Sequence, residues 1–221
     1  MNTSHIGKES VGKIAERIIA NELEYRGFLV RDLNLERIAA NVDLLAAKDG
    51  TMWQIQVKGS SYETKYPNNG WWFQYGYCKD EHIQDKNAKM FNRIKNSFQA
   101  NIVALVCVRS PHECQCIFLP VEIAEQAAQI NIDCSLRTKK LDGSNHRPGK
   151  VWFSFYPMEA RTPEKKVGII KEQELVKPFL IDRSHNIDRE TREADESKSS
   201  GVLNKVFAFS ESTVLTDSLG G

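Results

Sequence analysis

The segment VDLLAAKDGTMWQIQVKG, residues 42–59, constrains the fold most, because two strand-like stretches flank a turn. Trp53, Ile55 and Val57 alternate with polar residues, and this period of two predicts a strand with one buried face. The Lys-Asp-Gly sequence before them is typical of a tight hairpin turn. The segment therefore predicts two antiparallel strands that meet at residues 49–50.

Hydrophobic patterns in the rest of the chain predict an α/β domain around this hairpin. Apolar residues at helical spacing predict one helix over residues 4–26 and a second over residues 79–98. Further strands are predicted at FLVRDL, ANIVALVCVR, CQCIFLPVE and KVWFSFYP, and a short helix at VEIAEQAAQI. The run ANIVALVCVR is continuously apolar, as expected of a buried central strand. The predicted fold is an α/β protein with a mixed central sheet flanked by helices.

The composition changes near residue 158, which divides the chain into a compact domain and an extension. Residues 1–158 hold the predicted sheet, whereas residues 159–200 are highly charged and poor in aromatics. The run DRETREADESKSS is typical of a solvated or disordered segment, or of a helix on a partner. The last stretch, GVLNKVFAFSESTVLTDS, is apolar again, and docking on the domain or on a second subunit both stay open. The extension, residues 159–221, is our candidate for an oligomerisation element.

Composition also limits the class of function. The 221 residues carry a formal net charge of +1, so any basic surface must be local. The apolar runs are too short to span a bilayer, and the first ten residues lack the apolar core of a signal peptide. Five cysteines without a CxxC pair favour reduced thiols, with Cys114 and Cys116 as ligands for a metal as the alternative. We expect a cytoplasmic protein with no membrane partner.

Several polar side chains are predicted to converge at the hairpin. Gln56 and Lys58 are two residues apart on one strand and therefore share a face. A turn at residues 49–50 makes Asp43 and Gln56 equidistant from it, so the two would face each other across the ladder. Asp43 stands among apolar residues, where a carboxylate without a partner is costly. A carboxylate, an amide and a lysine are thus expected at one place.

This set suits the hydrolysis of phosphodiester bonds with a divalent cation. Mg²⁺ prefers oxygen ligands and keeps several waters, so Asp43, the Gln56 side-chain oxygen and the Val57 carbonyl would supply the protein ligands. The metal would activate a bound water and offset charge in the transition state. Lys58 would orient the water or hold developing negative charge. Glu16, in the first predicted helix, would bind the metal directly or through water.

These residues resemble the PD-(D/E)xK nuclease superfamily, in its variant with Gln at the second acidic position. AERIIANELEYRGFLVRD is similar to the opening helix and strand of Holliday-junction resolvases and related endonucleases, and NVDLLAAKDGTMWQIQVKGS to their Asp…(E/Q)xK core. The resemblance implies a restriction-endonuclease-like fold, Mg²⁺ or Mn²⁺ as cofactor, and Glu16, Asp43, Gln56 and Lys58 as the catalytic set. Val42 stands where many relatives have Pro, and neutral Gln56 replaces an acid.

Candidate contacts with nucleic acid lie outside this set. Lys86, Lys89 and Arg93 fall on one face of the helix predicted at residues 79–98, where they would follow phosphates; a solvated face is the alternative. Gly59 and Ser60 lack bulk and would let a phosphate backbone approach where the strand ends. The aromatic segment GWWFQYGY either stacks on unpaired bases or belongs to the core or an interface.

The expected function is a metal-dependent DNA endonuclease of the restriction, defence or junction-cleaving kind. Its substrate would be duplex or branched DNA, while RNA stays open. A homodimer or higher homo-oligomer is expected because a duplex has two strands to cut. The alternative is an inactive nuclease-fold module that binds DNA or protein, in which Gln56 marks a lost site.

Overall fold

The structure is a computed structural model, and every structural statement below concerns the residues that it describes. These are residues 8–33, 42–61, 71–77, 100–110, 113–137, 150–155, 174–183 and 201–208. The chain forms two compact units, one of residues 1–61, 100–121 and 179–221, and one of residues 62–99 and 122–178. The second unit is therefore inserted into the first at two points of the sequence.

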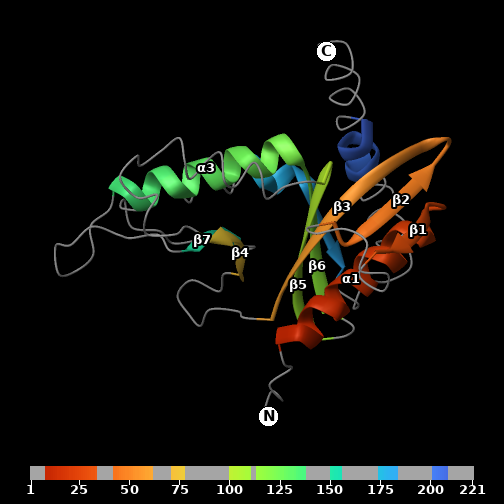
Figure 1. Cartoon of the computed structure of the whole chain (residues 1–221), viewed down its shortest axis with the longest axis horizontal. Coiled ribbons are helices and arrows are strands. Elements are labelled where there is room, and N and C mark those ends of the chain that lie inside the picture. Colours follow the sequence, from red (N-terminus) through yellow and green to blue (C-terminus); the bar gives the residue numbers. More distant parts are fainter. Residues whose placement is uncertain are drawn as a thin grey trace. The chain divides into compact units, whose positions relative to one another are not determined.

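The first unit is built on a six-stranded mixed sheet (Figure 1). Its only parallel pair is β3 with β5, and all other neighbouring strands in it run antiparallel. The predicted fold class, an α/β protein with a mixed central sheet, is confirmed. In spatial order the strands are β1 (Leu29–Asp32), β2 (Leu44–Lys48), β3 (Thr51–Ser60), β5 (Ile102–Ser110), β6 (Glu113–Pro120) and β8 (Leu180–Arg183).

The hairpin of β2 and β3 has the predicted turn. Leu44 pairs with Ile55 at one end of the ladder and Lys48 with Thr51 at the other. The turn between them has positive φ at both central positions, 50° at Asp49 and 83° at Gly50. A tight hairpin turn of this kind matches the twist of the strands, and Asp-Gly is one of its preferred sequences.

Helix α1 (Lys8–Tyr25) packs through an apolar stripe and ends in a glycine cap. Val11, Ala15, Ile19 and Leu23 are buried at a spacing of four residues, as the sequence predicts. Gly27, with φ 79°, donates its N–H to the Glu24 carbonyl, and the next residue donates to the Leu23 carbonyl. This pattern is a Schellman motif, which stops the helix and turns the chain toward β1.

Helix α1 and strand β3 approach closely because Gly59 has no side chain. A Cβ atom on Gly59 would lie 2.7 Å from the Ala15 Cβ and 2.9 Å from the Val11 carbonyl oxygen. Helix α1 therefore covers the face of β3 that carries Val57 and Gly59. Since side chains alternate along a strand, Gln56 and Lys58 lie on the other face.

Parts of the predicted extension belong to the first unit. Strand β8 pairs with β6 and adds an edge to the sheet. Residues 201–208 form a helix whose Phe207 ring lies 4.6 Å from that of Phe28 and 4.8 Å from that of Trp53, centroid to centroid. For residues 201–208 the structure shows docking on the domain, whereas the rest of this apolar stretch lies outside the described residues.

The second unit holds a two-stranded antiparallel sheet of β4 (Trp71–Tyr77) and β7 (Lys150–Phe155). Helix α3 (Val121–Arg137) begins where the units meet in sequence and is longer than predicted, and a 3-10 turn, η3 (Lys177–Phe179), precedes β8. Phe73 of β4 is buried, so one ring of the aromatic segment serves the core. Base stacking by the others stays a prediction, and the helix predicted at residues 79–98 lies outside the described residues.

Among the residues that the structure describes, no helix is long and apolar enough to cross a bilayer.

Candidate metal centre

The site begins where β2 and β3 stop pairing. Leu44 still pairs with Ile55, but the N–H of Asp43 donates to the same Ile55 carbonyl, at 2.9 Å, instead of continuing the ladder to Gln56. Two residues of one strand thus face one residue of the other, as in a β-bulge, which redirects side chains. The expectation that Asp43 sits directly opposite Gln56 is wrong by this one residue, because the ladder ends at Leu44.

The Asp43 side chain replaces the missing backbone partner. Its Oδ2 accepts the Val57 N–H at 2.6 Å, a short, charge-assisted hydrogen bond. The donor nitrogen belongs to the peptide bond between Gln56 and Val57, so the carboxylate lies beside the backbone of both. The main chain of Asp43 is held as well, because its carbonyl accepts the Leu33 N–H at 2.9 Å.

The Val57 carbonyl points to the same side of β3 as the Val57 N–H, because both backbone groups of a strand residue face one neighbouring strand. That neighbour would be β2, which has already diverged at this position. The carboxylate of Asp43 and the carbonyl oxygen of Val57 thus lie on one edge of β3. Two oxygen ligands of the kind that Mg²⁺ prefers are brought together by the end of the ladder.

Gln56 is buried, with 3% of its surface exposed, although the sequence predicts an outward position. The burial is local to this part of β3, because Gln54, two residues earlier on the same face, is exposed. Its Oε1 atom has no hydrogen-bond partner among the residues that the structure describes. A buried acceptor left in this state costs about 1–3 kcal/mol, so it marks a place where a donor or a cation would be stabilising.

Lys58 and Glu16 approach from different elements. Lys58 is half-buried and shares the face of Gln56. Glu16, also half-buried, follows Ala15 on the turn of α1 that crosses β3 at Gly59. The helix therefore brings Glu16 to the end of the strand that carries Lys58, while approaching it from the opposite face.

The other predicted contact residues are placed differently. The space beside Gly59 is filled by α1. The lack of a side chain there therefore admits a helix rather than the phosphate backbone that we expected. Ser60 is buried, with 6% of its surface exposed, which leaves little of it for contact with nucleic acid. Lys86, Lys89 and Arg93 lie outside the described residues, and their role stays a prediction.

Asn101 supports the site strand and was not singled out by the sequence. Its side-chain Oδ1 accepts the Gln54 N–H at 2.9 Å, and its own N–H donates to the Gln54 carbonyl at 2.8 Å. These bonds start the parallel pairing of β3 with β5 one residue before Ile55 meets Ile102. A polar Asn at the beginning of the apolar run ANIVALVCVR was the available signal.

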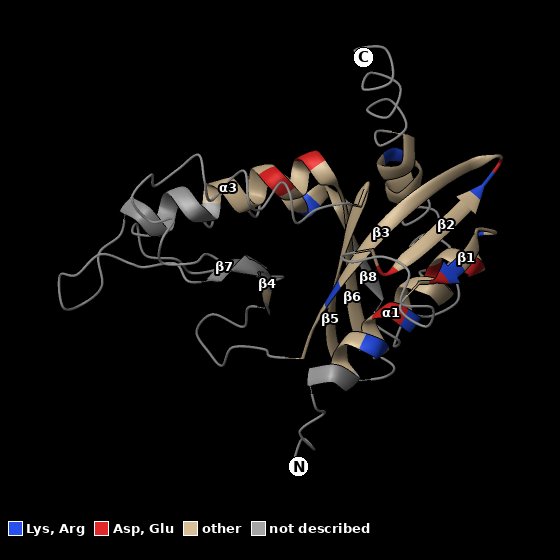
Figure 2. Cartoon of the chain, in the orientation of Figure 1, with Lys and Arg blue, Asp and Glu red and all other residues tan. Residues whose placement is uncertain are grey.

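The charges around the site have mixed signs. Figure 2 shows acidic and basic residues interspersed along α1. In the sequence of this helix, Lys13, Glu16 and Arg17 follow one another within five residues. Glu22, which is buried on the same helix, forms an ion pair with Arg26. The described part of α1 therefore offers no continuous basic stripe for phosphates.

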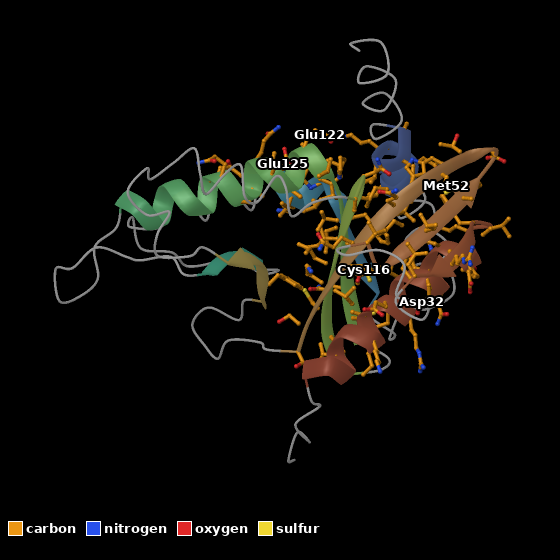
Figure 3. The ribbon with its side chains drawn as sticks, viewed as in Figure 1. Asp32, Met52, Cys116, Glu122 and Glu125 are labelled. Carbon is orange, nitrogen blue, oxygen red and sulfur yellow. The ribbon has the colours of Figure 1, made fainter. Side chains whose placement is uncertain are left out.

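The cysteines of the sheet belong to no group of three possible metal ligands among the described residues. Cys116, in the middle of the sheet (Figure 3), has the pKa of its thiol raised by a hydrogen bond with the Cys114 side chain and by burial. A raised pKa disfavours the thiolate that a metal would need. Across the described ranges, no three side chains of His, Cys, Asp or Glu gather where they could hold an ion.

Comparisons with known proteins give limited matches. No family model matches the chain. Two UPF0102 proteins from strains of Tropheryma whipplei are 32% and 31% identical to it over 65 residues, which is 29% of this chain and 54% of each relative. The chain thus spans about half the length of the curated relatives it matches.

Two solved structures show a distant similarity over most of this chain. A bacterial homing endonuclease has a TM-score of 0.41 and 11% identity, covering 72% of this chain and 86% of its own. A structure of MepB has a TM-score of 0.31 and 12% identity, covering 78% and 98%. Because both TM-scores are low, the fold is assigned from the sheet of this chain, and the candidate site is argued from its own hydrogen bonds and burial.

Proposed function

We propose that this chain is a metal-dependent endonuclease that hydrolyses phosphodiester bonds in DNA. The observation that carries the proposal is the hydrogen bond from the Val57 N–H to Asp43 Oδ2, at 2.6 Å. It fixes a carboxylate beside the peptide bond of Gln56 and Val57, and the next residue is Lys58. The order and spacing of these residues are those of the (D/E)xK nucleases that the sequence resembles.

The residues present fit a hard divalent cation. The buried Oε1 of Gln56 lacks a partner among the described residues, and Asp43 and the Val57 carbonyl add two oxygens nearby. Asp43, Gln56 and Val57 would hold Mg²⁺ or Mn²⁺, with Glu16 reaching it directly or through water. A bound cation would supply Lewis-acid stabilisation and lower the pKa of a water.

The chain's own side chains have distinct roles in this proposal. Asp43 binds the cation and is kept in place by the Val57 N–H. Lys58, as a cation on the face of Gln56, holds the scissile phosphate and stabilises negative charge that develops on its oxygens. Gln56 is a ligand of the cation. Asn101 holds the strand through its hydrogen bond with the Gln54 backbone.

The proposal is tested by cleavage assays on plasmid, branched duplex, single-stranded DNA and RNA, each with Mg²⁺, Mn²⁺ or a chelator. We expect metal-dependent cleavage of at least one DNA substrate, and its loss in Lys58→Ala. Lys13→Ala, which removes an exposed lysine from α1, is the matched control and should cleave like the wild type. Equal activity in the wild type and Lys58→Ala, or none on any substrate, would overturn the proposal.

A second candidate function is a non-cleaving module that binds DNA or protein through the same fold. It is favoured by the neutral Gln56 and by the absence of a three-ligand cluster of His, Cys, Asp or Glu within the described ranges. Retained DNA binding without cleavage under any metal condition is the result that supports it. A band-shift assay beside the cleavage assay distinguishes the two functions.

We also propose that the active form is a homodimer or higher homo-oligomer, because two active centres can cut both strands of a duplex in one binding event. Light scattering of the full chain, with and without duplex, measures its mass. A monomer that still makes double-strand breaks at first order in protein concentration would contradict this assembly.

A further inference from the structure

The candidate metal centre carries little negative charge. Asp43 contributes one negative charge, Lys58 contributes one positive charge, and Gln56 and the Val57 carbonyl are neutral. Glu16 is the only other acidic member of the set, and it comes from the helix on the opposite face of β3. The side chains therefore leave a divalent cation largely uncompensated, unlike a site in which an acid occupies position 56.

Gln56 nevertheless has the properties of a ligand rather than of a solvated residue. It is 3% exposed, on the strand that carries Lys58, and its Oε1 has no partner among the described residues. Gln54, two residues earlier on the same face, is exposed instead. The neutral amide at position 56 thus offers an oxygen to a cation without the charge that would bind it tightly.

We propose that this site binds its cation and the substrate phosphate cooperatively, because the phosphate supplies the negative charge that Gln56 does not. Mg²⁺ is commonly bound by one or two carboxylates together with substrate phosphates. The inference rests on the proposed function and adds an order of binding to it: the cation binds weakly until DNA is bound. By linkage, the cation tightens DNA binding by the same factor.

Metal binding, rather than cleavage, gives the readout. Free Mn²⁺ is followed by electron paramagnetic resonance in titrations of the full chain, with and without a short DNA duplex. Spectra are recorded before a gel of the same samples shows cleavage of the duplex, and a titration of the duplex alone corrects for ions held by DNA. We expect the Mn²⁺ affinity to rise at least about tenfold when the duplex is present, within the usual range of coupling between sites.

Two matched substitutions assign the coupling to position 56. Gln56→Glu supplies the missing charge, so Mn²⁺ should bind about tenfold more tightly without DNA, and the gain on adding duplex should shrink. Gln54→Glu adds the same charge two residues away on the exposed part of the strand, and both affinities should stay at wild-type values. Thermal unfolding of each variant verifies that it is folded. If a variant does not fold, the wild-type titrations with and without duplex still test the coupling.

The outcomes separate this inference from the proposed function. A wild-type chain that cleaves DNA but binds Mn²⁺ equally with and without duplex overturns the coupling and leaves the nuclease intact. Equal Mn²⁺ affinity in folded Gln56→Glu and Gln54→Glu removes Gln56 from the ligand set. A chain that binds no Mn²⁺ in either state and cleaves nothing overturns both proposals.

Discussion

The two ends of the β2–β3 hairpin are held together by different interactions. At the turn end, residues 44–48 and 51–55 pair in an unbroken ladder, and backbone groups satisfy one another. At the other end, Asp43 leaves the ladder, and its carboxylate takes the N–H of Val57. One end is held by backbone pairing, whereas the other is held by a charged side chain.

The difference shows how the end of a strand ladder can position a carboxylate without a separate loop. A backbone N–H inside a sheet must find an acceptor, and a carboxylate serves as well as a carbonyl. The hydrogen bond from the Val57 N–H places the Asp43 carboxylate beside the backbone of β3. A regular ladder would instead have directed the Asp43 side chain to one face.

The largest effect is expected at the diverging end. Asp43→Asn keeps an oxygen for the Val57 N–H but loses the charge, so cleavage should fall about a hundredfold or more while stability is nearly kept, since metal ions contribute several kcal/mol to such transition states. Asp43→Ala also removes the acceptor and should cost about 1–3 kcal/mol in the free energy of unfolding. Cleavage assays and urea denaturation separate the two effects.

If Asp43→Asn is as unstable as Asp43→Ala, the acceptor role is wrong. Glu24→Gln removes an exposed carboxylate from α1 and serves as the control, with neither activity nor stability changed.

The paired end should depend on apolar packing instead. Phe207 is 4% exposed against Phe28 and Trp53, so Phe207→Ala should lower the free energy of unfolding by about 3–5 kcal/mol. Asn204→Ala, on the exposed side of the same helix, should change it by less than about 0.5 kcal/mol. Equal denaturation midpoints for the two variants would show that residues 201–208 do not hold Trp53.

Gly59 tests the close approach of α1 to the site strand. In Gly59→Ala the new Cβ meets Ala15 and the Val11 carbonyl, and overpacking of this kind costs about 1–3 kcal/mol. Gly12, inside α1, has no atom within 4 Å of an added Cβ, so Gly12→Ala should stabilise the protein by about 0.5–1 kcal/mol. Urea denaturation of both variants checks the opposite signs, and a neutral Gly59→Ala would contradict the packing.

Asn101 is expected to have the smallest effect. Asn101→Ala removes the acceptor of the Gln54 N–H and should cost about 0.5–1.5 kcal/mol, while Asn101→Asp keeps an oxygen and should cost less. Amide hydrogen exchange at Gln54, measured by NMR, reports on this bond directly. Unchanged exchange in Asn101→Ala would show that the side chain does not support the strand.

Much of the fold could be predicted because it depends on local patterns. The hairpin follows from alternation and an Asp-Gly turn, α1 from its apolar spacing, and β5 from a continuous apolar run, while the pairing of β5 with β3 is known only from the structure. Strands β4 and β8 were missed, since a short edge strand and an aromatic segment rich in turn residues lack a clear period. The docking of Phe207 on Trp53 joins residues far apart in sequence, which no local pattern encodes.

The residues of the candidate site could be proposed from the sequence, but their arrangement could not. Residue order on the expected elements indicated Asp43, Gln56 and Lys58, but counting from the turn assumed a regular ladder. The one-residue divergence at Asp43 and the burial of Gln56 depend on how three neighbouring strands fit together. Gly59 was likewise interpreted as space for a ligand, because the sequence does not show that α1 crosses there.

The central claim is that the end of the β2–β3 ladder holds a divalent cation. Anomalous X-ray diffraction at the manganese edge, from crystals of the full chain grown with Mn²⁺ and a short duplex, tests it most directly. The account predicts a peak roughly 2.0–2.6 Å from an Asp43 carboxylate oxygen and from the Val57 carbonyl oxygen. A peak elsewhere, or none at Asp43 with duplex bound, would contradict it.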